Sequence, residues 1–337
     1  MTDILNALVL LANFLIIPGL TYGCQLALGA MGVTMIYGIL RFSNFAHGEL
    51  MSLGAMTTIL VTWWFNSMGI SLGFLPTALI ALPFGIVVAI LLSLGTDHMV
   101  YKFHRAQRSP SVIFLITSLG VMFFYGGLIR FIIGPNDQNF FDGTRFIIKA
   151  RTFKEMTGLD EGLAIKTTQG ITIIVTILVM VALFWFLNRT RTGKSMRAYS
   201  DNRDLALLSG IDPNRVVLYV WIIVAIVATI AGTLYGLDKS YKPFTYLQLL
   251  LPIFAAAIVG GMGSPVGAVV GGFVIAFSET ILTFAFRKVV AYLTPGDWMP
   301  EGLLQLLTTD YKFAISFAIL VITLLIRPTG IFKGQTI

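Results

Sequence analysis

Long apolar runs without Asp, Glu, Lys or Arg dominate this chain of 337 residues. Three of them cover residues 4–40, 50–96 and 249–278. A helix needs only about 20 such residues to cross the hydrocarbon core of a bilayer, and the alternating pattern of a membrane β-barrel is absent from the sequence. Because a backbone in lipid must satisfy its hydrogen bonds internally, the runs predict membrane-spanning helices.

The spans make up an all-α, polytopic bundle that forms a single domain over residues 1–337. We expect eight to ten spans and prefer ten, because the first run stops at Pro18 after about 14 residues and the run from Leu249 is soon interrupted by Gly and Pro. The composition agrees, since only 12% of the residues are charged, about half the usual share in a soluble protein. The ten expected spans are residues 4–17, 20–40, 50–65, 74–94, 112–130, 170–187, 216–237, 249–260, 266–286 and 313–326.

The charges in the connecting loops predict the orientation of the bundle. Segments 97–108 and 188–215 carry an excess of Lys and Arg, which is typical of cytoplasmic loops. The longest polar segment, 134–169, balances five basic with five acidic residues and is expected on the outer side. Ten spans then place both termini in the cytoplasm. Because the net charge of +7 is spread over short loops, we expect membrane lipid rather than nucleic acid around this chain.

A polar insert, residues 41–49, separates two of the spans. Ionisable and amide side chains are costly at membrane depth, so Asn44, His47 and Glu49 are candidates for lining a solute path or latching two helices together. The alternative is local: Asn44 caps the next helix, while His47 and Glu49 pair with nearby backbone groups. The insert alone does not decide between the two.

A second interruption, residues 258–267, contains four closely spaced glycines and a proline. It is typical of a broken or re-entrant helix that exposes backbone groups to a solute, with Gly261, Gly263 and Ser264 on the path. A tight hairpin between two spans produces the same residues. Gly263, Gly267 and Gly271 also recur at every fourth position, which indicates close helix packing.

The basic loop 188–215 contains a third feature, a short helix that ends at Gly210 and Pro213. It combines a small apolar patch with charges, as expected of a helix that docks on another protein, although a helix lying on lipid headgroups has a similar pattern. The residues that we assign to this contact are Arg197, Ala198, Asp201, Asn202, Ala206 and Gly210.

Enzyme chemistry finds little support in the sequence. Gly193-Lys194-Ser195 resembles the end of a phosphate-binding loop, but Asn188 stands where that loop needs its first Gly. There is no pair of histidines with metal-ligand spacing. We therefore expect a non-catalytic chain without a metal or cofactor.

Four motifs in order give the chain a recognisable pattern: residues 37–49, 197–211, 260–264 and 327–332. Together they resemble the permeases of the branched-chain amino acid family of ABC importers, over residues 19–333. The resemblance implies a multi-pass protein of the bacterial inner membrane. It also implies that the helix at 197–210 is a coupling helix, which docks on cytoplasmic ATPase subunits.

The same resemblance implies further partners and a mechanism. These are a second related permease subunit and a periplasmic solute-binding protein, with transport by alternating access driven by ATP on the separate subunits. The expected solutes are branched-chain or related amino acids; urea and short-chain amides are an alternative within the family. A gradient-driven secondary carrier is a further alternative, but it should carry several intramembrane carboxylates, and only Glu279 lies well within a span.

Overall fold

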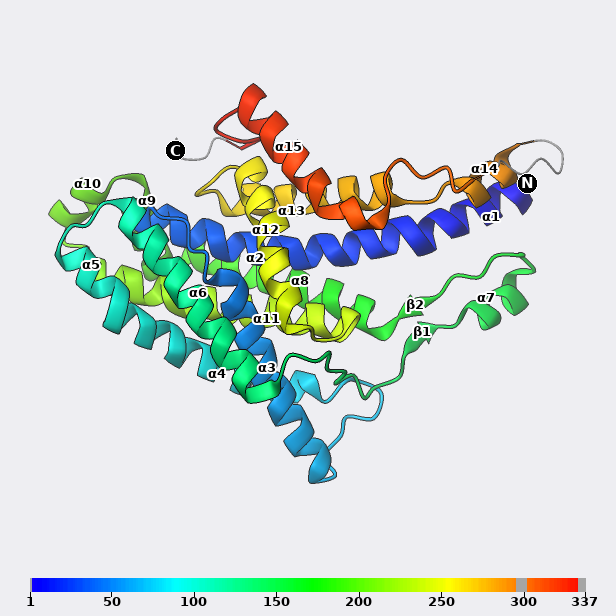
Figure 1. Ribbon diagram of the computed structural model, residues 1–337, viewed down its shortest axis with the longest axis horizontal. Helices are drawn as coiled ribbons and strands as arrows, with labels where there is room; N and C mark the ends of the chain where they lie inside the picture. Colours follow the sequence, from blue (N-terminus) through cyan, green and yellow to red (C-terminus); the bar gives the residue numbers. More distant parts are fainter. Residues whose placement is uncertain (1, 295–301, 333–337) are drawn as a thin grey trace.

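The computed structural model describes residues 2–294 and 302–332 and is mainly helical (Figure 1). Eight helical segments in this part of the chain are long and apolar enough to cross a membrane. Several begin with a proline, which the first turn tolerates because its N–H groups have no partner there. The helices and strands are α1 (Thr2–Leu11), α2 (Ile17–Leu40), α3 (His47–Ser67), α4 (Ala78–Thr96), α5 (Lys102–Ala106), α6 (Ser111–Ile133), β1 (Phe146–Ile148), α7 (Ala150–Thr157), β2 (Ile165–Lys166), α8 (Thr167–Arg189), α9 (Arg191–Asp201), α10 (Arg203–Leu208), α11 (Pro213–Lys239), α12 (Pro243–Gly260), α13 (Pro265–Thr283), α14 (Arg287–Leu293) and α15 (Lys312–Ile326).

The first helical segment runs unbroken from Thr2 to Leu40. A π-turn, Ala12–Ile16, joins α1 to α2, and Pro18 falls in the first turn of α2. Gly19 does not end a helix: a Cβ there would lie 2.9 Å from the Phe277 ring of α13, so this glycine allows close packing. The expectation of two spans over residues 4–17 and 20–40 is therefore wrong.

The expected span at residues 50–65 lies in α3, which has 21 residues but is not among the eight strongly apolar segments. It packs against α4 and α11, and most of its N-terminal half is buried in the protein. The all-α, polytopic bundle is confirmed, and eight apolar segments fall within the expected range. The preferred count of ten is not what the structure has.

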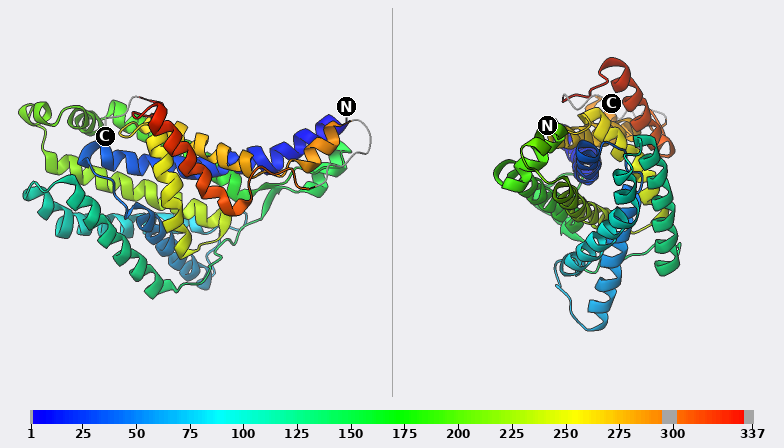
Figure 2. Two further views of the ribbon diagram at one scale, coloured as in Figure 1. Left: turned by 45° about the horizontal axis from the view of Figure 1, so that its top comes forward. Right: turned by 90° about the vertical axis from the view of Figure 1, so that its left-hand side faces the viewer.

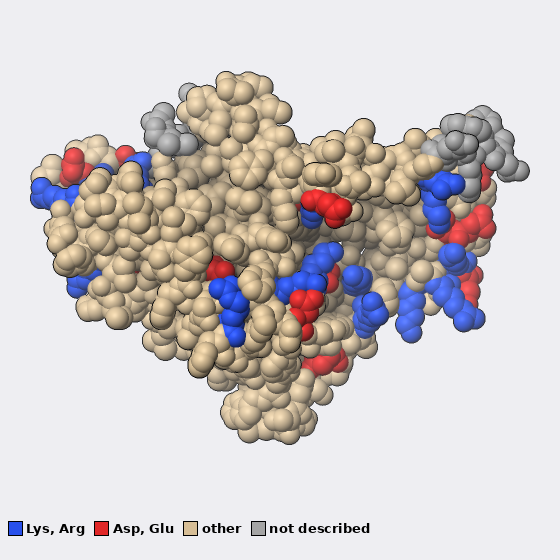
Figure 3. Space-filling view, viewed as in Figure 1, with Lys and Arg blue, Asp and Glu red and all other residues tan. Residues whose placement is uncertain are grey.

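The elements outside the bundle gather at two opposite ends of the molecule (Figures 1 and 2). The α9 end carries α5, α9 and α10, and the α7 end carries α1, α7, α14 and the antiparallel pair β1–β2. On the face shown in Figure 3, Lys, Arg, Asp and Glu gather at the α9 end and from the centre of the face to the α7 end, and an uncharged band separates the two groups. An uncharged band of this kind is expected where a bundle lies in lipid.

The two ends of the described chain lie on opposite sides of the bundle. At the α7 end, Asn6 of α1 donates a hydrogen bond to Asp160 at 3.3 Å. Far from it, the backbone N–H of Ile331 donates to the carbonyl of Val259, at the C-terminus of α12, at 2.8 Å. The expectation that both termini share one side is therefore wrong, because residues 2–40 form one segment instead of two spans, while α3 still connects the two sides although it is not among the eight apolar segments.

Small residues bring the central helices into close contact. The Cβ of an alanine at Gly232 of α11 would lie 2.2 Å from the carbonyl oxygen of Met51 in α3. At Gly271 of α13 it would lie 2.0 Å from the carbonyl oxygen of Ala256 in α12. The recurring glycines thus allow backbone-to-backbone packing, as their spacing predicts.

Candidate functional site

The polar insert between α2 and α3 is buried at the junction of these helices. Asn44 is 2% exposed, and its Oδ1 accepts hydrogen bonds from the N–H of Ala46 at 3.1 Å and from the Tyr101 hydroxyl at 3.3 Å. This Asx turn comes just before α3, whose N-cap is Ala46 and carries no side-chain cap bond, so Asn44 does not cap the helix itself. The cavity that Asn44 borders has about 10 Å³, no more than one water needs.

His47 and Glu49 lie in the first turn of α3 but face different surroundings. His47 is 0% exposed and packs against Gly32 of α2, where a Cβ would lie 2.4 Å from the imidazole Cε1. Glu49 is 3% exposed, and its carboxylate lies against Gly126 of α6. Only Glu49 therefore reaches a second charged group.

That group is Arg130 of α6, which the sequence pattern did not single out. A Cβ on Gly126 would lie 3.1 Å from Arg130 Nη2 and 3.2 Å from Glu49 Oε1, so both groups border the same small space. Arg130 Cζ also lies 4.9 Å from the centre of the Phe244 ring of α12. In the sequence, Arg130 could have been noticed only as a charged residue near the end of an apolar run. Its position beside Glu49 depends on how α3 packs on α6.

An apolar cavity of about 310 Å³ lies farther along α6 and α12 and is completed by α15. Phe45 and Phe254 form part of its wall, and their ring centres are 5.2 Å apart. Leu115, also in the wall, precedes Arg130 by 15 residues on α6, or about 22 Å of helix. The charged pair and the apolar cavity therefore lie at separate places along α6.

The second interruption forms a tight turn between α12 and α13. Ser264 is the N-cap of α13, and its Oγ accepts a hydrogen bond from the N–H of Gly267 at 3.1 Å. Gly261 has a φ of 113°, which favours glycine, and a Cβ there would lie 2.0 Å from the carbonyl oxygen of Phe332. Of the two alternatives for this segment, the structure has the tight hairpin, and Gly261 and Gly263 lie in its turn.

Segments far apart in the sequence meet at this turn. A Cβ on Gly38 of α2 would lie 3.3 Å from Ser200 Oγ of α9 and 3.6 Å from Gly263 Cα. Ser200 Oγ donates to the carbonyl of Gly38 at 3.0 Å, and the N–H of Phe332 donates to the carbonyl of Gly260 at 3.0 Å. All four sequence motifs thus contribute to one junction that joins α2, α9 and the α12–α13 turn.

The loop helix expected over residues 197–210 is divided into α9 and α10. Asn202 interrupts it with a φ of −148°, and its Oδ1 accepts a hydrogen bond from the N–H of Leu205 at 3.0 Å. Asn is among the strongest N-caps, so it starts a new helix here. Among the residues assigned to this loop contact, Ala206 is buried, and the exposed ones are Arg197, Ala198, Asp201, Asn202 and Gly210.

The short helix α10 presents apolar side chains to solvent. Leu205 is 61% and Leu208 85% exposed, beside the charged Arg203 and Asp204. The preceding helix, α9, buries its side chains Met196 and Tyr199 against the bundle. The pair of helices therefore has one face anchored to the bundle and one free apolar face among charges.

A second acid–base pair lies between α2, α13 and α15. Glu279 is 0% exposed, accepts a hydrogen bond from Ser316, and lies 3.5 Å from Lys312 Nζ. Lys312 Nζ is 3.7 Å from the ring centre of Tyr22. Within residues 2–294 and 302–332, no three His, Cys, Asp or Glu side chains are grouped so that they could hold a metal ion.

Comparisons with known proteins give this arrangement its context. A family model described as "Branched-chain amino acid transport system / permease component" matches residues 15–324. The high-affinity branched-chain amino acid transport system permease protein LivH of Escherichia coli K12 is 31% identical over 93% of this chain and 92% of its own length. BraD of Pseudomonas aeruginosa is 28% identical over 94% of both chains, and a probable LivH of Methanocaldococcus jannaschii is 28% identical over 92% of this chain and 89% of its own. This chain, a multi-pass protein of the inner membrane, therefore belongs to the family of branched-chain amino acid transport permeases.

Proposed function

We propose that this chain is the membrane-spanning subunit of an ATP-driven importer for branched-chain or related amino acids. The observation that carries the proposal is the junction of α2, α9 and the α12–α13 turn, which links a loop helix with a free apolar face directly to the spanning helices. Arg41 strengthens this link, because its Nη2 donates to the carbonyl of Ser200 at 2.7 Å. A movement of α9 would therefore be transmitted to α2.

In this proposal the α9 end faces the cytoplasm, and α10 docks on a separate ABC ATPase subunit through Leu205 and Leu208. The basic charge of the loop supports this orientation. The α7 end, with residues 134–166, then lies outside, where a periplasmic solute-binding protein delivers the solute. A second related permease subunit completes the assembly. Closure of the ATPases on ATP would switch the path between outward and inward openings, and hydrolysis would reset it.

For the solute path we propose a groove along α6 that runs from the space between Glu49 and Arg130 to the apolar cavity bordered by α12 and α15. A free amino acid carries an ammonium and a carboxylate group, which Glu49 and Arg130 complement. An aliphatic side chain fits the apolar wall of Phe45, Leu115 and Phe254 farther along the groove. Because about 22 Å separates the two places along α6, they would act in succession. Asn44 and His47 support this path by holding the start of α3 in position.

The coupling proposal is tested by purifying the chain together with its candidate ATPase subunits and the solute-binding protein. Leu208→Asp places a charge on the free face of α10 and should abolish ATPase association and solute-stimulated ATP hydrolysis. Met156→Asp is the matched control for ATPase association, because Met156 is 82% exposed on α7, at the opposite end. Association that survives Leu208→Asp unchanged would remove α10 from the interface.

The energy source and the solute need separate measurements. Uptake into vesicles that contain this chain alone, driven by an ion gradient, would contradict the ATP-driven assignment and support a secondary carrier. Binding of leucine, urea and acetamide to the cognate solute-binding protein identifies the solute. Leucine-like amino acids are the expected ligands; preference for urea or acetamide would overturn the amino-acid assignment without affecting the coupling proposal.

A further inference from the structure

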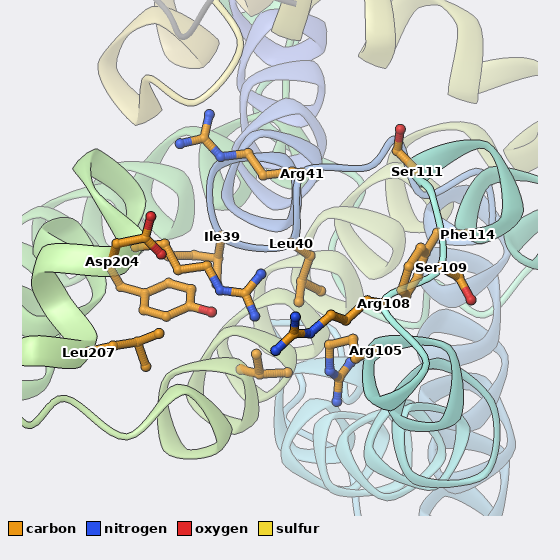
Figure 4. A pocket seen from close by; sticks show the side chains of 13 residues that line it. Ile39, Leu40, Arg41, Arg105, Arg108, Ser109, Ser111, Phe114, Asp204 and Leu207 are labelled. Carbon is orange, nitrogen blue, oxygen red and sulfur yellow. The ribbon is translucent and has the colours of Figure 1, made fainter.

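Four arginines line one cavity of about 540 Å³ at the α9 end of the molecule (Figure 4). It lies between the C-terminus of α2, the connection from α5 to α6, the pair α9–α10 and the start of α11. The arginines are Arg41, Arg105, Arg108 and Arg203. We propose that this cavity binds the headgroup phosphate of an acidic phospholipid, a ligand that is separate from the transported solute.

The charge of the cavity favours an anion. Arg105 is already neutralised by Asp97, with Nη1–Oδ1 and Nη2–Oδ2 distances of 2.5 Å and 2.8 Å. Asp204 also lines the wall and offsets one further arginine. The side chains in the wall therefore keep a net positive charge after both acids are counted. Burial raises the pKa of Tyr199 above its ordinary value, so this lining hydroxyl adds no negative charge.

The start of α6 adds to this positive field. Ser111 is its first residue, and Ser109 and Ser111 both line the cavity. The free N–H groups at the start of a long helix favour a negatively charged group, and the two serine hydroxyls can donate hydrogen bonds to it. Together with the arginines they offer a phosphate several donors from different sides.

The position of the cavity favours a lipid as the source of that phosphate. Each long helix that contributes to the wall does so at its terminus: α2 at Leu40, α6 at Ser111 and α11 at Val217. Helix ends lie at the depth of the headgroups, and basic pockets between spanning helices on the cytoplasmic side are typical sites for acidic lipids. Next to the cavity, Val112 of α6 is 63% and Leu218 of α11 44% exposed, so lipid-facing surface adjoins it.

The inner wall of the cavity separates it from the bundle interior. Phe114 lines the cavity, and its ring packs on that of Phe42 with the centres 5.2 Å apart. Phe42 in turn packs on Tyr101, which packs on Trp221, at 5.3 Å in both cases. These aromatic side chains are all buried, so they favour a closed binding cavity over an exit for the solute.

Occupation of the cavity would join α2, α6 and α11 to the pair α9–α10, because Tyr199, Arg203 and Leu207 form one wall. This consequence, like the assignment to the cytoplasmic leaflet, rests on the proposed function. The binding itself is measured on the chain alone. A failure of lipid binding and a failure of ATPase coupling are therefore distinguishable.

The experiment titrates the purified full chain in detergent with dioleoylphosphatidylglycerol or dioleoylphosphatidylcholine and measures retained lipid by native mass spectrometry. We expect at least about tenfold tighter binding of phosphatidylglycerol, since each basic residue near a headgroup contributes about a fivefold factor. Arg108→Gln combined with Arg203→Gln should weaken phosphatidylglycerol binding by about 30-fold and phosphatidylcholine binding much less, because the choline group offsets the charge of its phosphate. Arg191→Gln, an exposed arginine of α9 outside the cavity, is the control.

If the double variant fails to fold, Asp204→Asn provides a second test. Removing this acid should tighten phosphatidylglycerol binding about fivefold. Equal binding of the two lipids, or an Asp204→Asn variant without tighter binding, would overturn the proposal. Displacement of the lipid by millimolar inorganic phosphate would assign the cavity to a soluble anion instead. Displacement by millimolar leucine would assign it to the solute path. An assembly with the ATPase that excludes phosphatidylglycerol would assign it to that partner.

Discussion

Two acid–base pairs lie in the helical bundle, and they are built differently. Glu279 and Lys312 form an ion pair at 3.5 Å, with a further hydrogen bond from Ser316. Glu49 and Arg130 instead border a common space beside Gly126. Low-dielectric surroundings make an unpaired charge costly. Glu279 is neutralised by Lys312 within the protein, although its Oε2 has no hydrogen-bond partner among the described residues, whereas Glu49 and Arg130 face a space between them that a ligand could occupy.

The difference separates two roles that a buried charge can have in a membrane protein. An ion pair joins helices, here α13 to α15, and the loss of one partner leaves the other charge unpaired. An acid and a base on either side of a small space match the two charged groups of an amino acid. We therefore expect replacements at the first pair to affect stability and replacements at the second to affect transport.

The largest effect is expected for Glu279→Ala, which leaves Lys312 without its acid. Breaking one side of a buried pair costs about 3–5 kcal/mol. The Lys312 side chain is 29% exposed, so we expect the lower end, a loss of about 3 kcal/mol in the free energy of unfolding. Thermal unfolding of the chain in detergent measures it. The double variant Glu279→Leu with Lys312→Met should recover most of the loss, and equal instability of both variants would contradict the pairing.

Glu49→Gln and Arg130→Gln should each reduce uptake by about 10- to 100-fold, because a hydrogen bond to a charged group contributes about 1.5–3 kcal/mol. Stability should fall by less than the loss of about 3 kcal/mol expected for Glu279→Ala, because Glu49 and Arg130 border a common space and do not form an ion pair like that of Glu279 and Lys312. Uptake by the reconstituted assembly and thermal unfolding are measured on the same preparations. Glu155→Gln, in the exposed ion pair with Arg151 on α7, is the matched acid-to-amide control. Unchanged uptake in an intact assembly would show that neither residue lies on the path.

The spans could be predicted from the sequence because backbone groups in lipid must be hydrogen-bonded within the protein, which makes every long apolar run a helix. The same rule could not show that residues 2–40 are one helical segment, since Pro18 is tolerated in a first turn that follows a π-turn. Asn44 illustrates a local signal: its side chain makes a turn two residues along, although the expected capping of α3 is not observed. Arg130 and Lys312 were missed because their acids are 81 and 33 residues away in the sequence, and only helix packing brings them together. The transport role of His47 stays a prediction.

A smaller effect is expected for Ser316→Ala, which removes the hydroxyl that donates to Glu279. The carboxylate keeps its ion pair with Lys312, so the free energy of unfolding should fall by about 1.5 kcal/mol, half of the loss expected for Glu279→Ala. Thermal unfolding in detergent again provides the measurement. Ser67→Ala is the control, since Ser67 Oγ donates only to the exposed carbonyl of Trp64. A Ser316→Ala variant as stable as the original chain would show that Glu279 does not depend on this bond.

The smallest effect is expected for Gly126→Ala, which adds one methyl group between Glu49 and Arg130 without changing either charge. Its Cβ would lie 3.2 Å from Glu49 Oε1 and 3.1 Å from Arg130 Nη2, so the ends of both side chains must shift. Alanine also favours the helix by about 0.5–1 kcal/mol, and stability should therefore be unchanged or slightly higher. Uptake should fall about two- to fivefold, because the space for the charged groups of the solute becomes smaller. Gly127→Ala is the matched control on the same helix, since its Cβ meets nothing within 4 Å; an equal fall in uptake for both variants would assign the effect to α6 as a whole rather than to the space between Glu49 and Arg130.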